Sequence, residues 1–287
     1  MPHCTGGLHR VTLARMNRLL PALFAMTLID LPLHAVEIIA HRGASHDAPE
    51  NTLAAFKLGW EQGADADELD IYLSKDNEIV VLHDKTTKRT AGLDKAVAEQ
   101  TLSELKKLDA GTWKDARFAG ERIPTLKEAL ATMPAGKKMF IEIKCGPEVL
   151  PPLQKLLRES GRPAQQLVII CFEEDTLRKA RPLFPDLELY WLVGWPKDKA
   201  GQPPVAKPNV EDLIATAKAA GFTGLNLQAD FPIDKTFVEK VSAAGLKLYT
   251  WTVNDAAKAA MLAQAGVAGI TTDRPAWLRG QLKSAAR

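Results

Sequence analysis

From residue 36 onward, short apolar runs alternate with segments of helical periodicity, and this alternation constrains the fold more than any other feature. Eight runs have the length of a buried strand: residues 37–41, 67–73, 139–144, 167–172, 187–193, 223–228, 246–252 and 267–272. Strands that alternate with helices form parallel sheets covered on both faces. Eight of them favour closure into a (β/α)8 TIM barrel, a fold of about 250 residues that the 287-residue chain can accommodate.

Capping residues mark the helices between these runs. Asn51 or Thr52 can cap a helix whose apolar residues share one face, and Thr125 with Glu128 has the capping-box spacing. Glycines 221, 245 and 266 each stand where a helix must end before the next strand. These signals place helix boundaries between the strands and support the α/β assignment.

The alternation is interrupted once, after the second strand. Asp76 and Asn77 separate residues 67–73 from a further extended run at 79–83, which predicts a hairpin. A two-residue loop at Asp76-Asn77 would place Asp70 directly opposite His83. The stretch from 85 to 138 is too long for an ordinary connection, so we expect a small inserted cap at about residues 85–124.

Residues 1–35 have the pattern of a secretory signal peptide. Arg15 and Arg18 precede the apolar run 19–29, and Ala35 offers a cleavage point. We therefore expect residues 36–287 to be the barrel domain, and the protein to be periplasmic or secreted without stable membrane insertion. Without cleavage it would be cytoplasmic.

The charge balance argues against nucleic acid as a partner. Residues 1–35 contain three arginines and one aspartate, which accounts for the whole net charge of +2. The barrel domain is therefore neutral overall and lacks the basic stripe that nucleic-acid binding needs.

Carboxylates occur within strands that are otherwise apolar. Glu68, Asp70 and Glu142 lie in or at the end of two such strands. A carboxylate is costly to bury unless it is paired or binds a metal, and oxygen ligands suit a divalent cation such as Ca²⁺ or Mg²⁺. The alternative is simple ion pairing, of Glu142 with Lys144 and of Glu68 or Asp70 with an arginine.

Two histidines end different strands. His41 is followed by Arg42, and His83 closes the expected hairpin. Active sites of barrels occupy the carboxyl ends of the strands, so one imidazole could act as base and the other as acid. Arg42, Lys144 and a cation could hold the anionic oxygens of a phosphodiester.

The motifs of this chain, in their order, resemble those of the glycerophosphodiester phosphodiesterase family. They are His41-Arg42-Gly43, Pro49-Glu50-Asn51-Thr52, Glu68-Leu69-Asp70, Val81-Leu82-His83-Asp84, Glu142-Ile143-Lys144, Trp251-Thr252-Val253-Asn254 and Ile270-Thr271-Thr272-Asp273-Arg274-Pro275. The resemblance covers about residues 37–280 and implies a barrel with a small cap and a divalent metal.

The resemblance also implies roles for single residues. His41 and His83 correspond to the acid/base pair, and we expect His41 to be the base. Glu68, Asp70 and Glu142 correspond to the metal ligands, Arg42 and Lys144 to phosphate contacts, and Trp251 to the glycerol end of the pocket. Glu50 is similar to a residue near the family's site, or else serves the start of a helix.

The implied activity is metal-dependent hydrolysis of a small glycerophosphodiester to sn-glycerol 3-phosphate and an alcohol such as choline or ethanolamine. Two alternatives stay open. One is a lipid-directed phosphodiesterase of lysophospholipase D or sphingomyelinase D type, which a long apolar mouth in the cap would favour. The other is a periplasmic phosphate-ester binding protein without catalysis.

Overall fold

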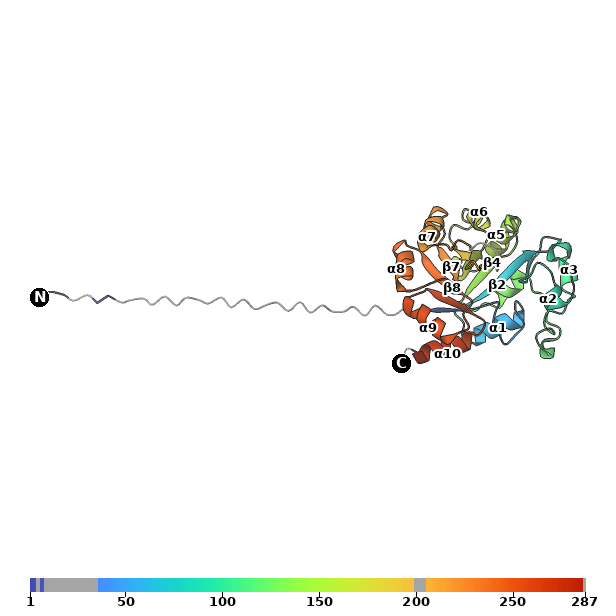
Figure 1. The fold of residues 1–287 in the computed structure, drawn as a ribbon, viewed down its shortest axis with the longest axis horizontal. Coiled ribbons are helices and arrows are strands. Elements are labelled where there is room, and N and C mark those ends of the chain that lie inside the picture. Colours follow the sequence, from blue (N-terminus) through green and yellow to red (C-terminus); the bar gives the residue numbers. More distant parts are fainter. Residues whose placement is uncertain (4–5, 8–35, 199–204, 286–287) are drawn as a thin grey trace. The chain divides into compact units, whose positions relative to one another are not determined.

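Eight parallel strands close into a barrel, as the alternating sequence predicts (Figure 1). Around the barrel they are β1 (Glu37–Ala40), β2 (Ala66–Leu73), β4 (Lys138–Ile143), β5 (Leu167–Cys171), β6 (Glu188–Val193), β7 (Gly224–Gln228), β8 (Lys247–Trp251) and β9 (Gly269–Thr272), and β9 pairs with β1. Each predicted strand boundary lies within two residues of the observed one. The strand prediction is therefore confirmed.

This computed structural model describes residues 1–3, 6–7, 36–198 and 205–285. Nearly all of the expected signal peptide, residues 1–35, lies outside the described residues. Val36–Arg287 form one unit. Within the described part of the chain, no helix is both long and apolar enough to cross a bilayer.

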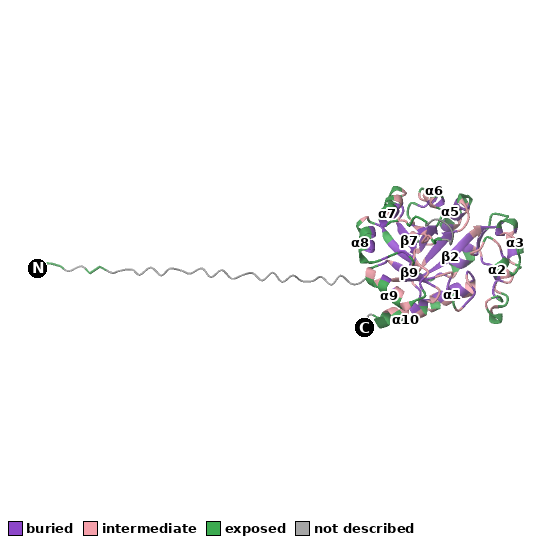
Figure 2. Cartoon of the chain, in the orientation of Figure 1, coloured by how far each residue is buried: buried purple, intermediate pink, exposed green. Residues whose placement is uncertain are grey.

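Helices surround the barrel and cover its strands (Figure 1). They are α1 (Leu53–Glu61), α4 (Leu126–Ala131), α5 (Leu150–Glu159), α6 (Glu174–Ala180), α7 (Val210–Ala219), α8 (Lys235–Ala243), α9 (Ala256–Ala265) and α10 (Pro275–Ala285). Thr52 caps α1 by accepting a hydrogen bond from the Ala55 N–H, and Thr125 and Glu128 form the predicted capping box of α4. Burial is greatest along the strands and least on the outer helix faces (Figure 2).

Aromatic side chains fill the barrel interior beneath the carboxyl ends of the strands. Phe140, Tyr190 and Tyr249 are buried in one interior cluster, and the ring centroids of the two tyrosines are 4.7 Å apart. Side chains two residues apart on a strand point to the same face, so Glu142 lies above Phe140 inside the barrel. The acidic carboxyl end of the interior thus lies on a layer of aromatic rings.

The hairpin forms, but its predicted register is wrong by one residue. In the antiparallel pair of β2 and β3 (Ile79–Val81), Ile71 faces Val81, and the Leu82 N–H donates to the Asp70 carbonyl at 3.0 Å. Asp70 therefore lies opposite Leu82, not His83. The loop has three residues rather than two, since Ser74 pairs with Glu78 and Asn77 adopts φ +60°.

Between β3 and α4 the chain forms short helices beside the barrel (Figure 1). These are α2 (Lys88–Ala91), α3 (Leu102–Leu105) and the 3-10 turns Val97–Glu99 and Ala116–Phe118. They share a small core with the hairpin, made of Val80, Leu82, Val97, Leu105, Ala110 and Ile123. This segment is the insertion expected after the second strand, and it packs on the β2–β3 hairpin.

Candidate active site

A small pocket of about 130 Å³ lies at the carboxyl end of the barrel. It collects side chains from all around the sheet, and seven of the eight predicted site residues line it. Its lining is His41, Arg42, Glu68, His83, Glu142, Lys144, Ile170, Phe172, Leu192, Asn226, Trp251, Thr252 and Thr271. The eighth, Asp70, lies directly beside it in the acidic cluster.

Three buried carboxylates form the centre of the site. Glu68, Asp70 and Glu142 each offer an oxygen, and these oxygens lie within 4.8 Å of one another. Burial, together with the charges of Asp70 and Glu142, raises the pKa of Glu68 well above its usual value. Burial, followed by the charge of Asp70, raises the pKa of Glu142 to about 7. The cluster is therefore an unfavourable place for three negative charges unless a cation joins them.

The donor set of this cluster fits a divalent cation. Asp70 Oδ1 is buried and receives no hydrogen bond from any described residue, while its Oδ2 accepts one from Asn51 Nδ2 at 2.8 Å. Asn51 thus fixes the carboxyl group and leaves one oxygen free beside Glu68 and Glu142. Carboxylate oxygens in this number are typical ligands of Mg²⁺ and Ca²⁺.

Both ion pairs of the alternative interpretation are also present. Lys144 Nζ lies 2.7 Å from Glu142 Oε1 and 3.6 Å from Asp70 Oδ1. Arg42 Nε lies 3.3 Å from Asp70 Oδ2. These two cations offset part of the acidic charge, and they stand at the rim of the cluster, where an anionic phosphate would also be attracted.

The backbone at the end of β1 turns sharply to bring Arg42 into the site. Arg42 adopts φ +56°, a left-handed conformation that costs energy for a residue other than glycine. Its N–H donates to Glu68 Oε2 at 2.9 Å. A Cβ atom at Gly43 would lie 2.5 Å from the Ala55 carbonyl carbon, so only glycine allows this approach to α1.

His41 is oriented by the carboxylate of Asp273, which pairs with no other cation among the described residues. Its Nδ1 lies 2.6 Å from Asp273 Oδ1, and Asp273 also accepts hydrogen bonds from Ser45 Oγ and from Asn254 Nδ2. Burial alone would raise the pKa of Asp273, but these hydrogen bonds and His41 lower it to about 2. His41 Nε2 is left to face the pocket.

His83 is oriented in a similar way by the carboxylate of Asp84, but this carboxylate also binds an arginine. Its Nδ1 lies 2.6 Å from Asp84 Oδ1, and Arg89 Nε donates to Asp84 Oδ2 at 2.7 Å. The hydrogen bond from Arg89 is the main reason that the pKa of Asp84 is lowered to about 2. Burial, helped by Arg42 and Lys144, lowers the pKa of His83 below its usual value.

Arg89 of the cap connects the two sides of the site. Besides Asp84, it donates to both oxygens of Glu50, each at 2.8 Å. Glu50 in turn accepts a hydrogen bond from Arg42 Nη1 at 2.8 Å. A continuous chain of charged hydrogen bonds therefore runs from His83 through Arg89 and Glu50 to Arg42.

Trp251 closes the pocket on the side away from the acidic cluster. Its indole Nε1–H donates to the Asn226 carbonyl at 3.0 Å, and its ring packs edge to face on Phe172 with centroids 5.4 Å apart. Phe172 is 39% exposed, so the two rings form an accessible apolar wall.

Sequence reasoning did not assign roles to several residues that the structure brings into the site. Asp273 and Asn254 lie in matched motifs but received no role, and Arg89 lies outside them. The position of Asp273 directly after a buried strand, like that of His41, is the one signal that could have found it. Asn51 was considered only as a helix cap, although it orients Asp70.

Comparison with known proteins agrees with this geometry. Residues 41–277 match the model of the glycerophosphoryl diester phosphodiesterase family. A glycerophosphodiester phosphodiesterase of Caldanaerobacter subterraneus subsp. tengcongensis is 36% identical over 244 residues, which cover 83% of this chain and 94% of that protein. One from Bacillus subtilis is 30% identical over 257 residues, covering 83% of each chain.

Solved structures of phosphodiesterases also superpose on this chain. A phosphodiesterase of Oleispira antarctica, in complex with the product sn-glycerol-3-phosphate, superposes with a TM-score of 0.76 at 30% identity, covering 86% of this chain and 96% of that one. A glycerophosphodiester phosphodiesterase of Thermotoga maritima superposes with a TM-score of 0.69 at 27% identity, covering 86% of this chain and 98% of the other.

Proposed function

This chain belongs to the glycerophosphoryl diester phosphodiesterase family, and from this premise we propose that it cleaves small glycerophosphodiesters to sn-glycerol 3-phosphate and an alcohol in a cation-dependent reaction. The observation that carries the proposal is a cluster of three buried carboxylates at a pocket that also brings together two histidines, an arginine and a lysine. The product bound to the Oleispira antarctica relative supports a small-molecule substrate of this class.

Glu68, Asp70 and Glu142 would hold the divalent cation, Ca²⁺ or Mg²⁺. When bound, this cation supplies positive charge that polarises the phosphoryl group and offsets the charge that develops on its oxygens. Asp70 Oδ1, which is buried and accepts no hydrogen bond from the described residues, supports this assignment.

Arg42 and Lys144 would orient the phosphate. Both lie at the rim of the acidic cluster, and the arginine is held by Glu50 in a fixed position. Their charges favour the trigonal bipyramidal transition state, in which the non-bridging oxygens carry more charge than in the substrate.

The surroundings of the two histidines favour His83 as the base and His41 as the acid, the reverse of the expectation from sequence. Burial is the main reason that the neutral form of His83 is favoured, and Arg42 and Lys144 add to this effect against the opposing charge of Asp70. Among the described residues, Asp273 has only neutral donors besides His41, so its charge can stabilise the imidazolium of His41.

The proton balance of the step follows from these roles. His83 Nε2 removes a proton from the attacking hydroxyl as the new P–O bond forms, and His41 Nε2 gives its proton to the oxygen of the departing alcohol as the old P–O bond breaks. When water attacks, this step yields sn-glycerol 3-phosphate directly. When the substrate's own glycerol hydroxyl attacks, it yields a cyclic phosphate, which water then opens to sn-glycerol 3-phosphate with the two histidines in reversed roles.

We also propose that the enzyme acts outside the cytoplasm. The signal-like pattern of residues 1–35 supports this. Expression of the full chain with subcellular fractionation and N-terminal sequencing tests it: the exported form should begin near Val36, and a cytoplasmic protein that retains residues 1–35 would contradict it.

The activity is tested by incubating the protein with glycerophosphocholine and related diesters. A coupled dehydrogenase assay measures the sn-glycerol 3-phosphate that is released. We expect turnover with Mg²⁺ or Ca²⁺ and none with a chelator. Cleavage of only lysophospholipids or sphingomyelin would favour the lipid-directed alternative. Tight binding of intact glycerophosphocholine without turnover would favour the binding protein.

A further inference from the structure

One buried polar side chain of the catalytic pocket has an oxygen without a partner in the described part of the chain. Asn226 of β7 is only 2% exposed and lines the pocket, yet its Oδ1 accepts no hydrogen bond from any described residue. A buried carbonyl oxygen has lost its bonds to bulk water, so its burial costs free energy unless a donor reaches it. The pocket therefore holds an acceptor that the described residues do not use.

The alternation of the strand directs the Asn226 side chain into the barrel. Leu225 and Leu227, on either side of it, lie in the core that the strands share with the surrounding helices, so Asn226 points to the opposite face. Its register partners are Leu192 of β6 and Tyr249 of β8, both of which belong to the interior cluster. Asn226 thus places a carboxamide beside apolar and aromatic side chains.

Two donors on the neighbouring strand β8 are engaged elsewhere. The Trp251 Nε1–H donates to the main-chain carbonyl of Asn226 at 3.0 Å and not to its side chain. The hydroxyl of Tyr249 donates to Glu37 Oε2 at 3.0 Å. These bonds hold the two aromatic side chains in place and leave Asn226 Oδ1 to a donor that enters the pocket.

One half of a glycerophosphodiester supplies such a donor in every substrate of the class. The phosphodiester group is an anion that offers only acceptor oxygens, and an esterified choline has neither an O–H nor an N–H. The glycerol half carries two free hydroxyl groups, and a hydroxyl group can donate to a carboxamide oxygen. The donor that all these substrates share is therefore a glycerol hydroxyl.

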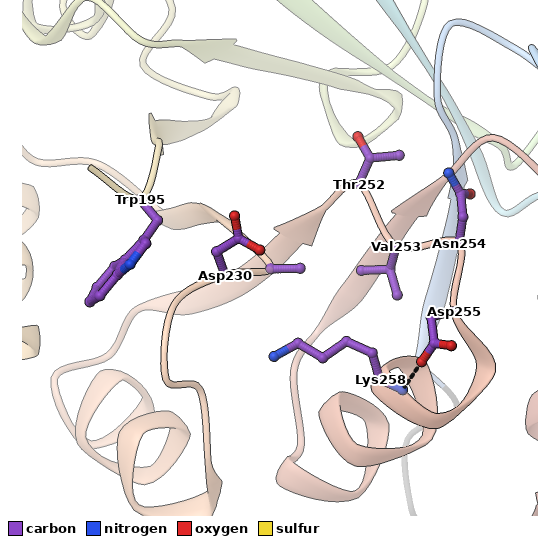
Figure 3. A pocket seen from close by; sticks show the side chains of 8 residues that line it. Trp195, Asp230, Thr252, Val253, Asn254, Asp255 and Lys258 are labelled. Carbon is purple, nitrogen blue, oxygen red and sulfur yellow. Dashed lines mark hydrogen bonds between the residues drawn. The ribbon is translucent and has the colours of Figure 1, made fainter. Parts of the chain in front are cut away.

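The size of the pocket also suits the glycerol half. Its volume of about 130 Å³ is below the range of about 300–1,000 Å³ that is typical of sites for drug-sized ligands. Thr252, which lines this pocket, also lines a larger cavity of about 610 Å³ that the loops after β6, β7 and β8 form (Figure 3). The three-carbon glycerol group needs little room, and a larger head group has open space beyond Thr252.

We propose that Asn226 recognises the glycerol half of the substrate, with its Oδ1 accepting a hydrogen bond from a free glycerol hydroxyl. β7 lies four strands from β2 in either direction around the barrel, so this contact is separate from the carboxylates Glu68 and Asp70. Asn226 then selects diesters that keep this hydroxyl over diesters that lack it. The inference rests on the proposed function, because it assigns a contact to one half of the same substrate.

Substrates that differ by a single hydroxyl group test the proposal. kcat/KM is measured as choline release, under one cation condition, for glycerophosphocholine, for 3-hydroxypropyl phosphocholine without the sn-2 hydroxyl, and for 2-hydroxypropyl phosphocholine without the sn-1 hydroxyl. With the wild-type protein, at least one analogue should react about tenfold more slowly than glycerophosphocholine, the effect of one hydrogen bond. In Asn226→Leu, which keeps the branched shape without the acceptor, this penalty should shrink by about tenfold.

Thr250→Val is the matched control. Thr250 is fully buried on the next strand and its Oγ1 also has no partner among the described residues, but it points away from the pocket, since Tyr249 and Trp251 point into the barrel. This variant should leave the penalty unchanged. Asn226→Ser keeps an acceptor and should retain part of the penalty. Melting temperatures show whether each variant folds, and Asn226→Ala replaces Asn226→Leu if the leucine is not accommodated.

Two results would overturn the inference. One is equal turnover of both analogues and glycerophosphocholine by the wild-type protein. The other is a penalty that stays the same for both analogues in a folded Asn226→Leu or Asn226→Ala, which would show that Asn226 Oδ1 meets only water. Absence of choline release from glycerophosphocholine by the wild-type protein would instead contradict the proposed function itself.

Discussion

Replacing Arg89 tests whether the cap sets the chemistry of His83. The Arg89 side chain is 42% exposed, so its ion pairs with Glu50 and Asp84 should together contribute only about 1–2 kcal/mol to the free energy of unfolding. Arg89→Ala should therefore lower the melting temperature by a few degrees. Because Asp84 loses the partner that fixes it, and with it the orientation of His83, kcat should fall about 10–100-fold.

The pH dependence of kcat/KM gives a second, independent measure of how Arg89 affects His83. Hydrogen bonds of 2.6 and 3.1 Å join His83 to Asp84 and Asp84 to Arg89, so the guanidinium lies within about 6 Å of the imidazole. A positive charge at that distance disfavours the protonated imidazole. Removing it therefore acts to raise the pKa of His83, and the acidic limb of kcat/KM should move to higher pH if His83 is the base.

Lys88→Ala is the matched control, since Lys88 is a neighbouring cation of α2 that pairs only with Asp94 in the described residues. It should change neither kcat nor the acidic limb, and added guanidinium ion should partly restore Arg89→Ala. An acidic limb that stays in place or moves down, with the fold intact, would refute the role assigned to His83.

Three further outcomes are expected. His41→Ala and His83→Ala should each abolish turnover while the circular dichroism spectrum and melting temperature stay near those of the wild type, and retained activity of either variant would contradict the acid/base pair. Because burial and Asp70 raise the pKa of Glu142 to about 7, protons compete with the cation below that pH, and calorimetry should find about tenfold weaker Mg²⁺ or Ca²⁺ binding at pH 6 than at pH 8. Asp67 is fully buried, neither of its oxygens is hydrogen-bonded to a described residue, and burial raises its pKa. The contribution of Asp67 to the free energy of unfolding is therefore most favourable below its unfolded pKa and becomes less favourable as pH rises through its folded pKa. Asp67→Asn should therefore stabilise the protein by about 1–3 kcal/mol in urea unfolding at pH 8 and by little at pH 4, whereas equal effects at both values would show that its charge is not the cause.

The barrel and the acidic cluster were predictable because burial leaves a pattern in sequence. Apolar runs mark the strands, and Glu68, Asp70 and Glu142 stand out as charges inside them. Their meeting point also follows from topology, since parallel strands bring their carboxyl ends to one face of the barrel.

The connections between side chains were not predictable in this way. The hairpin register depends on whether the loop has two or three residues, and the left-handed Asn77 decides this only in three dimensions. Arg89 bonds to Glu50, 39 residues away, and Asp273 to His41, 232 residues away. The cavity of Figure 3 likewise arises where three separate loops meet, and sequence reasoning found a motif in only one of them, at Thr252–Asn254.

The central claim is that one cation in the Glu68, Asp70 and Glu142 cluster supports phosphodiester cleavage. Its most direct test is a titration of the metal-stripped protein with Mg²⁺ or Ca²⁺, in which bound ion and release of sn-glycerol 3-phosphate are followed in the same samples. The account predicts that turnover rises in proportion to binding, saturates at one ion per chain, and is lost together with binding in Glu142→Gln. Full turnover in the metal-free protein, or unchanged binding in Glu142→Gln, would contradict it.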